Sequence, residues 1–132
     1  MAKFKINNQT IAIANTHLFW NPTYPDVKYE QIKYFIEQIE LFNKENFPVL
    51  LGRDLRPKEV SRKHRFLFES CYGNYCQGEE PKNREPEYTN YQKEFNGTLD
   101  YIFYDKTQLR HISLLKVPFY TKIEYLYKAS KT

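Results

Sequence analysis

The run Phe47-Pro48-Val49-Leu50-Leu51-Gly52 constrains this chain more than any other feature, because it is apolar without interruption until the glycine ends it. A strand at a protein surface alternates apolar and polar residues, whereas a strand buried on both faces is apolar throughout. The run therefore predicts a central strand of a sheet. The rest of the chain must supply its neighbours and the layer that covers them.

The segment that precedes this run has the residue spacing of an amphipathic helix. The pattern begins at Asp26, whose carboxylate is suited to cap the first turn. Charged residues stand outside the apolar stripe, as in a helix with one face in the core. The apolar positions are Val27, Ile32, Phe35, Ile36, Ile39 and Phe42. Upstream, Pro22 and Pro25 predict a loop over residues 20–25, since proline cannot propagate a helix interior.

Further apolar or alternating segments predict the remaining strands. They cover residues 4–6, 10–16, 98–104 and 112–117. The Asn7-Asn8 pair between the first two favours a tight hairpin, because asparagine tolerates positive φ. Residues 77–87 have no periodicity and predict an exposed loop. Strands around one helix predict an α+β fold, an α/β sandwich, in a single domain over residues 1–132.

Composition limits the function classes only broadly. The 132 residues include 17% aromatics and carry a formal net charge of +4. The apolar content is sufficient for a core and excludes a disordered chain. The positive balance suits a polyanionic partner such as nucleic acid, but an ordinary solvated surface is the more common cause of a charge this small.

The cysteines and the amino terminus indicate a cellular compartment. Cys71 and Cys76 lack the additional Cys or His ligands of a zinc site, so we expect reduced thiols. Residues 1–5 carry charge where a secretory signal would be apolar, and no run approaches the roughly 20 apolar residues of a membrane span. We therefore expect a soluble protein without membrane contact, located in the cytoplasm, with the nucleus as an alternative.

Three ionisable residues stand where the predicted strands end or begin, and such positions commonly line sites. They are His17, Asp54 and Asp100. The carboxylate of Asp100 lies within an apolar stretch, so it needs a polar partner unless it points outward from an alternating strand. Taken alone, His17 is more commonly a structural histidine and Asp54 a turn residue.

The neighbours of these residues add a family resemblance. Asn15-Thr16-His17-Leu18-Phe19-Trp20-Asn21-Pro22 resembles a segment of the deadenylases in the endonuclease/exonuclease/phosphatase superfamily. Tyr88-Thr89-Asn90-Tyr91 and Gly97-Thr98-Leu99-Asp100-Tyr101-Ile102 are similar to two more of their segments. This branch contains the carbon-catabolite-repressor-type subunits, nocturnin, the Angel proteins and the mitochondrial 2′,5′-phosphodiesterase. The resemblance implies the carboxyl-terminal part of a four-layer fold.

The resemblance also implies a magnesium-dependent 3′-5′ exoribonuclease that acts on poly(A). In this chemistry Mg²⁺ holds the scissile phosphate while a water attacks in line. The implied catalytic residues are His17 at the phosphate, Asp54 at the attacking water and Asp100 beside a carboxyl-terminal histidine. The implied substrate-binding residues are Asn15, Pro22, Asn90 and Phe95. Pro22 and Phe95 would sandwich an adenine of single-stranded RNA.

The chain departs from the family pattern at three places. No Asp or Glu precedes His17, so the family's metal-binding glutamate is missing and we assign no metal ligand. The Gly-Asp-Phe-Asn motif is replaced by Gly52-Arg53-Asp54-Leu55-Arg56, where a cation stands for a neutral asparagine, and the segment between Asp54 and Phe66 is short. The closing Ser-Asp-His is absent. We therefore expect a truncated domain that does not cleave RNA alone.

Alternatives remain open at this stage. The chain could be a non-catalytic truncated isoform or pseudoenzyme module, or a relative of the 2′,5′-oligoadenylate phosphodiesterases. Protein partners are not indicated by the residues. Half of a four-layer sandwich would expose the sheet face that the other half covers, so we expect an apolar patch and self-association.

Overall fold

The computed structural model describes residues 1–19, 21, 23–53, 64–73, 85–86, 89–92 and 95–115. Its elements, in chain order, are β1 (Ala2–Ile6), β2 (Gln9–Asn15), α1 (Pro25–Phe42), β3 (Val49–Arg53), β4 (Phe68–Ser70), β5 (Asn90–Tyr91), β6 (Asn96–Gly97) and β7 (Tyr101–Asp105). Within this described part, no helix is long and apolar enough to cross a membrane.

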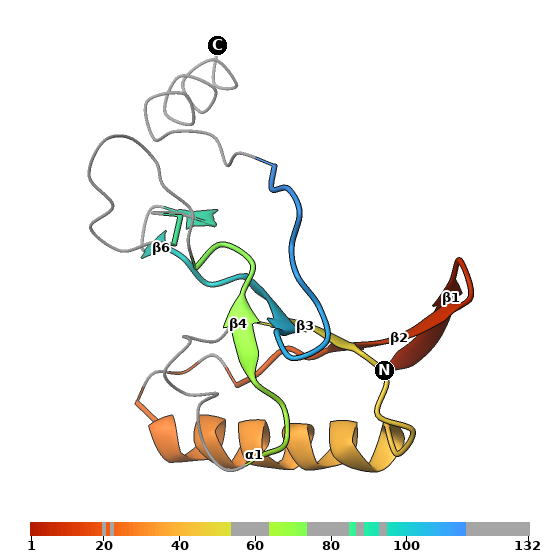
Figure 1. Ribbon diagram of the computed structural model, residues 1–132. Helices are drawn as coiled ribbons and strands as arrows, with labels where there is room; N and C mark the ends of the chain where they lie inside the picture. Colours follow the sequence, from red (N-terminus) through yellow and green to blue (C-terminus); the bar gives the residue numbers. More distant parts are fainter. Residues whose placement is uncertain are drawn as a thin grey trace.

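The main sheet has five strands in the order β1-β2-β3-β7-β4 (Figure 1). β3 is its central strand, as the uninterrupted apolar run predicts. β2 and β3 run parallel, and α1 connects them, while the other pairs are antiparallel. β5 and β6 form a separate two-stranded hairpin. The α+β prediction is confirmed.

The hairpin between β1 and β2 forms where the paired asparagines predict it. Asn7 and Asn8 have φ angles of 46° and 67°, in the left-handed region that a tight turn requires. The turn sets the register of the two strands, so that Phe4 lies opposite Ile11.

Helix α1 differs from the prediction at its amino terminus. Pro25 is the first helical residue and Tyr24 is the N-cap, without a side-chain cap bond. The predicted N-cap, Asp26, was wrong: the fixed φ of proline suits the first helical position, which leaves Asp26 inside the first turn. There its negative charge still favours the positive end of the helix dipole. Val27, assigned to the apolar stripe, is 45% exposed, because it lies beyond the edge of the packed face.

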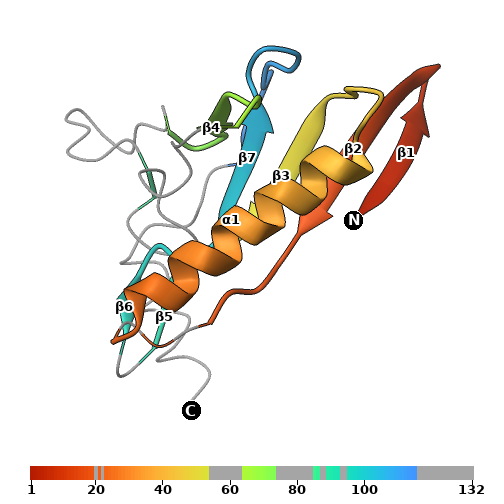
Figure 2. The same ribbon diagram turned by 90° about the horizontal axis from the view of Figure 1, so that it is seen from below.

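The core lies between α1 and one face of the sheet (Figure 2). Ala14, Leu51 and Phe103 are register partners on three adjacent strands, and they are 2%, 0% and 1% exposed. From the helix, Ile36 and Ile39 belong to the same buried cluster. Consecutive residues of a strand point to opposite faces, so the next row of the sheet faces away from α1.

A buried asparagine joins α1 to β3. Asn43 is 0% exposed and follows the last helical residue. Its Nδ2 donates to the carbonyl of Phe47 at 2.7 Å, and its Oδ1 accepts the N–H of Phe47 at 3.0 Å. Both polar atoms of the buried amide are thus paired, which burial requires. These bonds fix the turn that carries the chain from α1 into the central strand.

The predicted strand over 112–117 was wrong for its described part, residues 112–115, which has no strand structure. Ile112 and Leu115 are 94% and 85% exposed, so apolar composition alone did not bring this segment into the sheet. β4 already pairs with β7 on that side. The segment is held instead by single side-chain contacts, including a bond from the Tyr72 hydroxyl to the Leu115 carbonyl at 3.0 Å.

The sheet face that points away from α1 carries exposed apolar residues, as we expected, whereas Tyr104 on the same face is 6% exposed and contacts His111. Register places Phe4, Ile13, Leu50 and Ile102 on that face, and among them Phe4 and Ile102 are 49% and 51% exposed. None of the described residues forms a helix over it. Contiguous apolar surface of this kind marks an interaction surface or favours aggregation.

Replacing Leu51 by alanine should strongly destabilise the fold. Leu51 is 0% exposed in the centre of the core, so the expected loss is about 2–5 kcal/mol in the free energy of unfolding. Leu41→Ala is the matched control, because Leu41 is 60% exposed on α1 and should change stability by no more than about 0.5 kcal/mol. Urea denaturation measures both; equal losses would contradict the placement of the core.

The 132-residue chain expressed alone should self-associate through the open sheet face. Light scattering and size-exclusion chromatography should detect species larger than a monomer. The double variant Phe4→Thr/Ile102→Thr keeps β propensity but lowers apolar area, so it should shift the distribution towards monomer. Leu41→Thr, an equally exposed apolar site on α1, serves as control. A monodisperse wild-type monomer would refute the expectation.

Candidate functional site

Three of the sequence-predicted residues, Asn15, His17 and Asp100, lie at or next to one end of the sheet because of its strand directions. β2 and β3 end there, and β7, which runs antiparallel to β3, begins there. Asn15, Gly52 and Ile102 form one row across these strands, and the Thr16 N–H donates to the Gly52 carbonyl at 3.3 Å. His17 lies two residues beyond this row and Asp100 two residues before it. β2 and β7 flank a single strand, so their backbones are about 10 Å apart in this row.

Two predicted site residues cannot be placed by the structure. Asp54 and Pro22 lie outside the described residues. The described part of β3 ends at Arg53, the residue before Asp54.

Asn15 packs over the backbone of Gly52. A Cβ placed on Gly52 would lie 3.2 Å from Oδ1 of Asn15, which is closer than most real contacts. Glycine at this position therefore leaves room for the amide. Asn15 itself is exposed, so the amide borders solvent at the end of the sheet. Its position allows it to donate to or accept from a ligand at that end.

His17 is exposed, and the residues that follow it are held in place. Leu18, its neighbour, is 3% exposed and belongs to the core. The Phe19 N–H donates to Oε1 of Gln31 on α1 at 2.9 Å. The imidazole can thus reach an external ligand while its backbone is anchored to the helix.

Asp100 is exposed, which agrees with the second of the two alternatives that the sequence left open, a carboxylate that points outward. The described hydrogen bond of this residue comes from its backbone, whose N–H donates to the Thr89 hydroxyl at 2.9 Å. The buried carboxylate of this strand is instead Asp105, 2% exposed. Asp105 accepts from the Thr107 hydroxyl at 2.8 Å and from backbone N–H groups, including that of Leu67, so it closes a turn.

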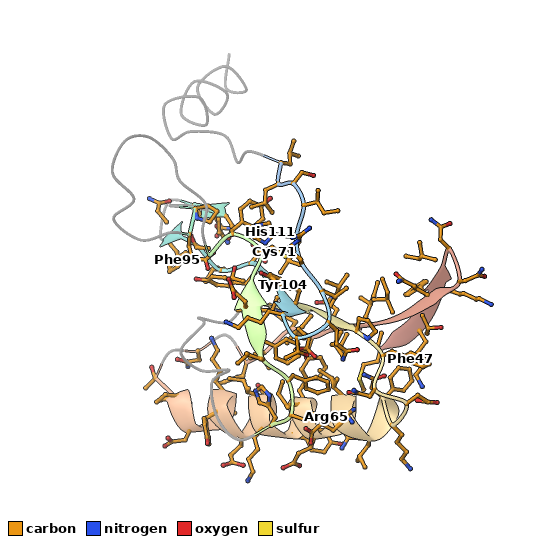
Figure 3. All side chains as sticks on the ribbon, viewed as in Figure 1. Phe47, Arg65, Cys71, Phe95, Tyr104 and His111 are labelled. Carbon is orange, nitrogen blue, oxygen red and sulfur yellow. The ribbon has the colours of Figure 1, made fainter. Side chains whose placement is uncertain are left out.

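The β5–β6 hairpin lies beyond the same end of the sheet, past the start of β7 (Figure 2). It carries Asn90, which is half-buried, and Phe95, which is 45% exposed. Figure 3 shows Phe95 on the hairpin, far from α1. The Phe95 ring lies over Gly97, where a Cβ would come within 3.1 Å of its Cζ. The ring is therefore positioned by the hairpin while much of its surface stays open to a ligand.

Sequence reasoning assigned no role to two residues that support the site. Gln31 holds the segment that carries His17, and Thr89 holds the segment that carries Asp100. Neither has the chemistry of a catalytic group. For Thr89 the available signal was its place within Tyr88-Thr89-Asn90-Tyr91, which resembles a deadenylase segment.

The described residues do not form a magnesium site by themselves. Nowhere in the described ranges do three or more His, Cys, Asp or Glu side chains cluster as ligands would. Magnesium prefers carboxylate and water oxygens in octahedral arrangement, and at this end of the sheet the described carboxylate is Asp100. We therefore derive no chemical step through a metal ion.

A second polar cluster lies on the side of the sheet away from α1, near Cys71, Tyr104 and His111 (Figure 3). The Ser70 hydroxyl donates to Glu85 at 3.1 Å, and burial raises the pKa of that carboxyl. Burial, and then the negative charge of Glu85, raise the pKa of the Cys71 thiol. Cys71 is free. A raised pKa lowers the share of the thiolate, which is the nucleophilic form of cysteine.

Comparisons with known proteins find CCR4-type relatives, which the sequence motifs also resemble, although no protein-family profile matches the chain. A probable CCR4-Not complex 3′-5′-exoribonuclease subunit Ccr4 of Vairimorpha ceranae is 30% identical over 122 residues, which cover 79% of this chain and 26% of that protein. The carbon catabolite repressor protein 4 homolog 4 of Arabidopsis thaliana is 29% identical and covers 89% of this chain. The CCR4-NOT transcription complex subunit 6-like-B of Xenopus laevis is 27% identical over 83%.

The structural comparison finds a similar fold. Truncated TDP2 of Caenorhabditis elegans matches with a TM-score of 0.54 and 16% identity, over 78% of this chain and 44% of that one. The chain therefore has an α+β fold similar to that of this protein. In sequence it is similar to one part of the CCR4-type proteins. It spans about a quarter to a third of the curated relatives' length, at 26%, 34% and 28%.

The relatives contain residues inside the aligned region that this chain lacks. The alignments with the Arabidopsis and Xenopus proteins extend over 144 and 158 positions, more than the 132 residues available here. The short segment between Asp54 and Phe66 is where the sequence predicts part of this difference.

The contact between Asn15 and Gly52 can be tested with a double-mutant cycle. Gly52→Ala should force the Asn15 amide to shift by a few tenths of an ångström and lower the free energy of unfolding by about 1–2 kcal/mol. In an Asn15→Ala background the same substitution should cost less, because the opposing amide is gone. Thermal unfolding of the four proteins gives the coupling; additive losses would show that the two residues do not touch.

Proposed function

We propose that this chain forms the carboxyl-terminal part of a magnesium-dependent 3′-5′ exoribonuclease-type site that binds single-stranded poly(A). We further propose that these 132 residues alone bind the RNA but do not cleave it. The names of the CCR4-type relatives support the substrate class, and the arrangement at the end of the sheet supports the position of the site.

One observation carries the proposal. The end of β2 and the start of β7 lie at one end of the sheet, and the β5–β6 hairpin lies beyond the start of β7 (Figure 2). His17 follows β2, Asp100 precedes β7 and Phe95 belongs to the hairpin, and all three side chains are exposed. An imidazole, a carboxylate and an aromatic ring are groups that can contact a phosphate, orient a partner and stack on a base, respectively.

In the proposed role, the aromatic ring of Phe95 stacks on an unpaired adenine, with Pro22 on the other side. Asn15 and Asn90 supply neutral hydrogen-bonding groups around the nucleotide. His17 contacts the scissile phosphate, Asp54 orients the attacking water, and Asp100 holds the imidazole of a further histidine in its useful tautomer. When bound, magnesium would supply charge stabilisation on the phosphate oxygens.

The proposed lack of cleavage follows from the residues that are present. No carboxylate precedes His17, and none of the three histidines follows an aspartate. Positioning and electrostatic stabilisation provide most of the catalysis in phosphoryl transfer, so the loss of these groups removes the largest contributions. A non-catalytic module is therefore part of the proposal. The alternative is a relative of the 2′,5′-oligoadenylate phosphodiesterases. The two proposals differ in whether the chain binds 3′,5′-linked or 2′,5′-linked oligoadenylate more tightly.

The binding part should be measured by fluorescence anisotropy with a labelled oligoadenylate. Phe95→Ala should weaken binding by about 1–3 kcal/mol, or roughly 5- to 150-fold in Kd, because one stacking surface is lost. Phe4→Ala is the matched control, since Phe4 has similar exposure but lies on the open sheet face. Oligouridylate should bind more weakly than oligoadenylate, and 2′,5′-linked oligoadenylate more weakly than the 3′,5′-linked form.

The cleavage part needs a separate assay. Labelled poly(A) is incubated with the chain and magnesium, and the released nucleotides are compared with those from a His17→Ala variant. We expect no difference between them. Turnover above the variant would refute the proposed inactivity, whereas equal Kd values for Phe95→Ala and wild type would refute the proposed binding site.

A further inference from the structure

Thr89 accepts two consecutive backbone N–H groups with one hydroxyl oxygen. The N–H of Leu99 lies 2.8 Å and that of Asp100 2.9 Å from its Oγ1. These two residues immediately precede β7. The hydroxyl thus binds the backbone of the segment that leads into β7.

Thr89 also belongs to the hairpin. Its N–H donates to the Gly97 carbonyl at 3.1 Å, and the next residue, Asn90, is the first of β5. A second threonine reinforces the junction, because the Thr98 hydroxyl donates to the carbonyl of the buried Pro86. One side of Thr89 therefore contacts the hairpin that carries Phe95, and the other contacts the backbone of Asp100.

We infer that Thr89 is a positioning residue that couples the proposed base-binding hairpin to the proposed catalytic carboxylate. The inference rests on the proposed function and goes beyond it, because it states how an adenine on Phe95 affects the remainder of the site. A base that stacks on Phe95 orders the hairpin, and the Thr89 hydroxyl transmits this order to the backbone of Asp100. An adenine bound on Phe95 thereby positions the Asp100 carboxylate before the phosphate is cleaved.

The alternative is that Thr89 merely stabilises the hairpin. Both roles predict some loss of stability when the hydroxyl is removed. They differ in what happens at Asp100 when a ligand binds at Phe95. If Thr89 only stabilises the hairpin, the response of the Asp100 backbone to that ligand does not depend on the Thr89 hydroxyl. The test therefore needs a residue-specific signal at each place and a variant that retains the hydroxyl.

The experiment uses the full ¹⁵N-labelled chain, with Thr89→Val and Thr89→Ser variants. Amide exchange at Leu99 and Asp100 should become about tenfold faster in Thr89→Val, and serine should restore the wild-type rates. Thr107→Val is the matched control, because it removes a hydroxyl bond to Asp105 at the opposite end of β7 and should leave these rates unchanged. Slow exchange in the core strands verifies that each variant is folded.

Titration with oligoadenylate then tests the coupling. In wild type and Thr89→Ser, amide shifts at Phe95 and Asp100 should change together, whereas in Thr89→Val the change at Phe95 should persist and that at Asp100 should be lost. Equal changes at Asp100 in all three proteins would overturn the coupling. Absence of any change in wild type would instead overturn the proposed function, and amide exchange alone would then decide the positioning role.

Discussion

The parallel pairing of β2 with β3 is the constraint on which the remaining arrangement depends. Parallel strands need a crossover, and α1 supplies it while covering one face of the sheet. The pairing brings the carboxyl ends of both strands to one edge, and antiparallel β7 adds its beginning to the same edge. Residues as distant in sequence as His17 and Asp100 thus come to one end of the sheet through backbone hydrogen bonds alone, and loops then adjust their side chains.

Much of this arrangement could be predicted, because helices and strands each give a characteristic spacing of apolar residues along the sequence. The uninterrupted apolar run identified β3, and the helical stripe identified the face formed by Ile32, Ile36 and Ile39. Errors occurred where a local pattern competes with its surroundings. Asp26 is a good cap by composition, but Pro25 begins the helix. Residues 112–115 are mostly apolar, yet they form no strand. Strand pairing depends on residues that are distant in the sequence, so a local pattern does not determine it.

The site was predicted by motif more than by physical reasoning. Burial arguments left open whether Asp100 needs a partner or points outward, and the buried carboxylate with partners is Asp105 at the far end of the same strand. The exposure of Asp100 is compatible with a site, since a group that meets a ligand has to be accessible. Gln31 and Thr89 were overlooked because side-chain bonds to distant backbone groups leave no periodic signal in a sequence.

The chemistry of the proposed site also determines what kind of affinity it can have. Phosphate neutralisation by Lys and Arg dominates most nucleic-acid binding and makes it strongly salt-dependent. The residues proposed to bind RNA here, Asn15, Asn90 and Phe95, carry no charge, and the proposed site also includes the acidic Asp100. Stacking and neutral hydrogen bonds therefore have to provide most of the affinity, and both need a base that is held in place. A site of this kind gains more from an ordered hairpin than from net charge, which is why the threonine at the base of that hairpin affects both recognition and the placement of the carboxylate.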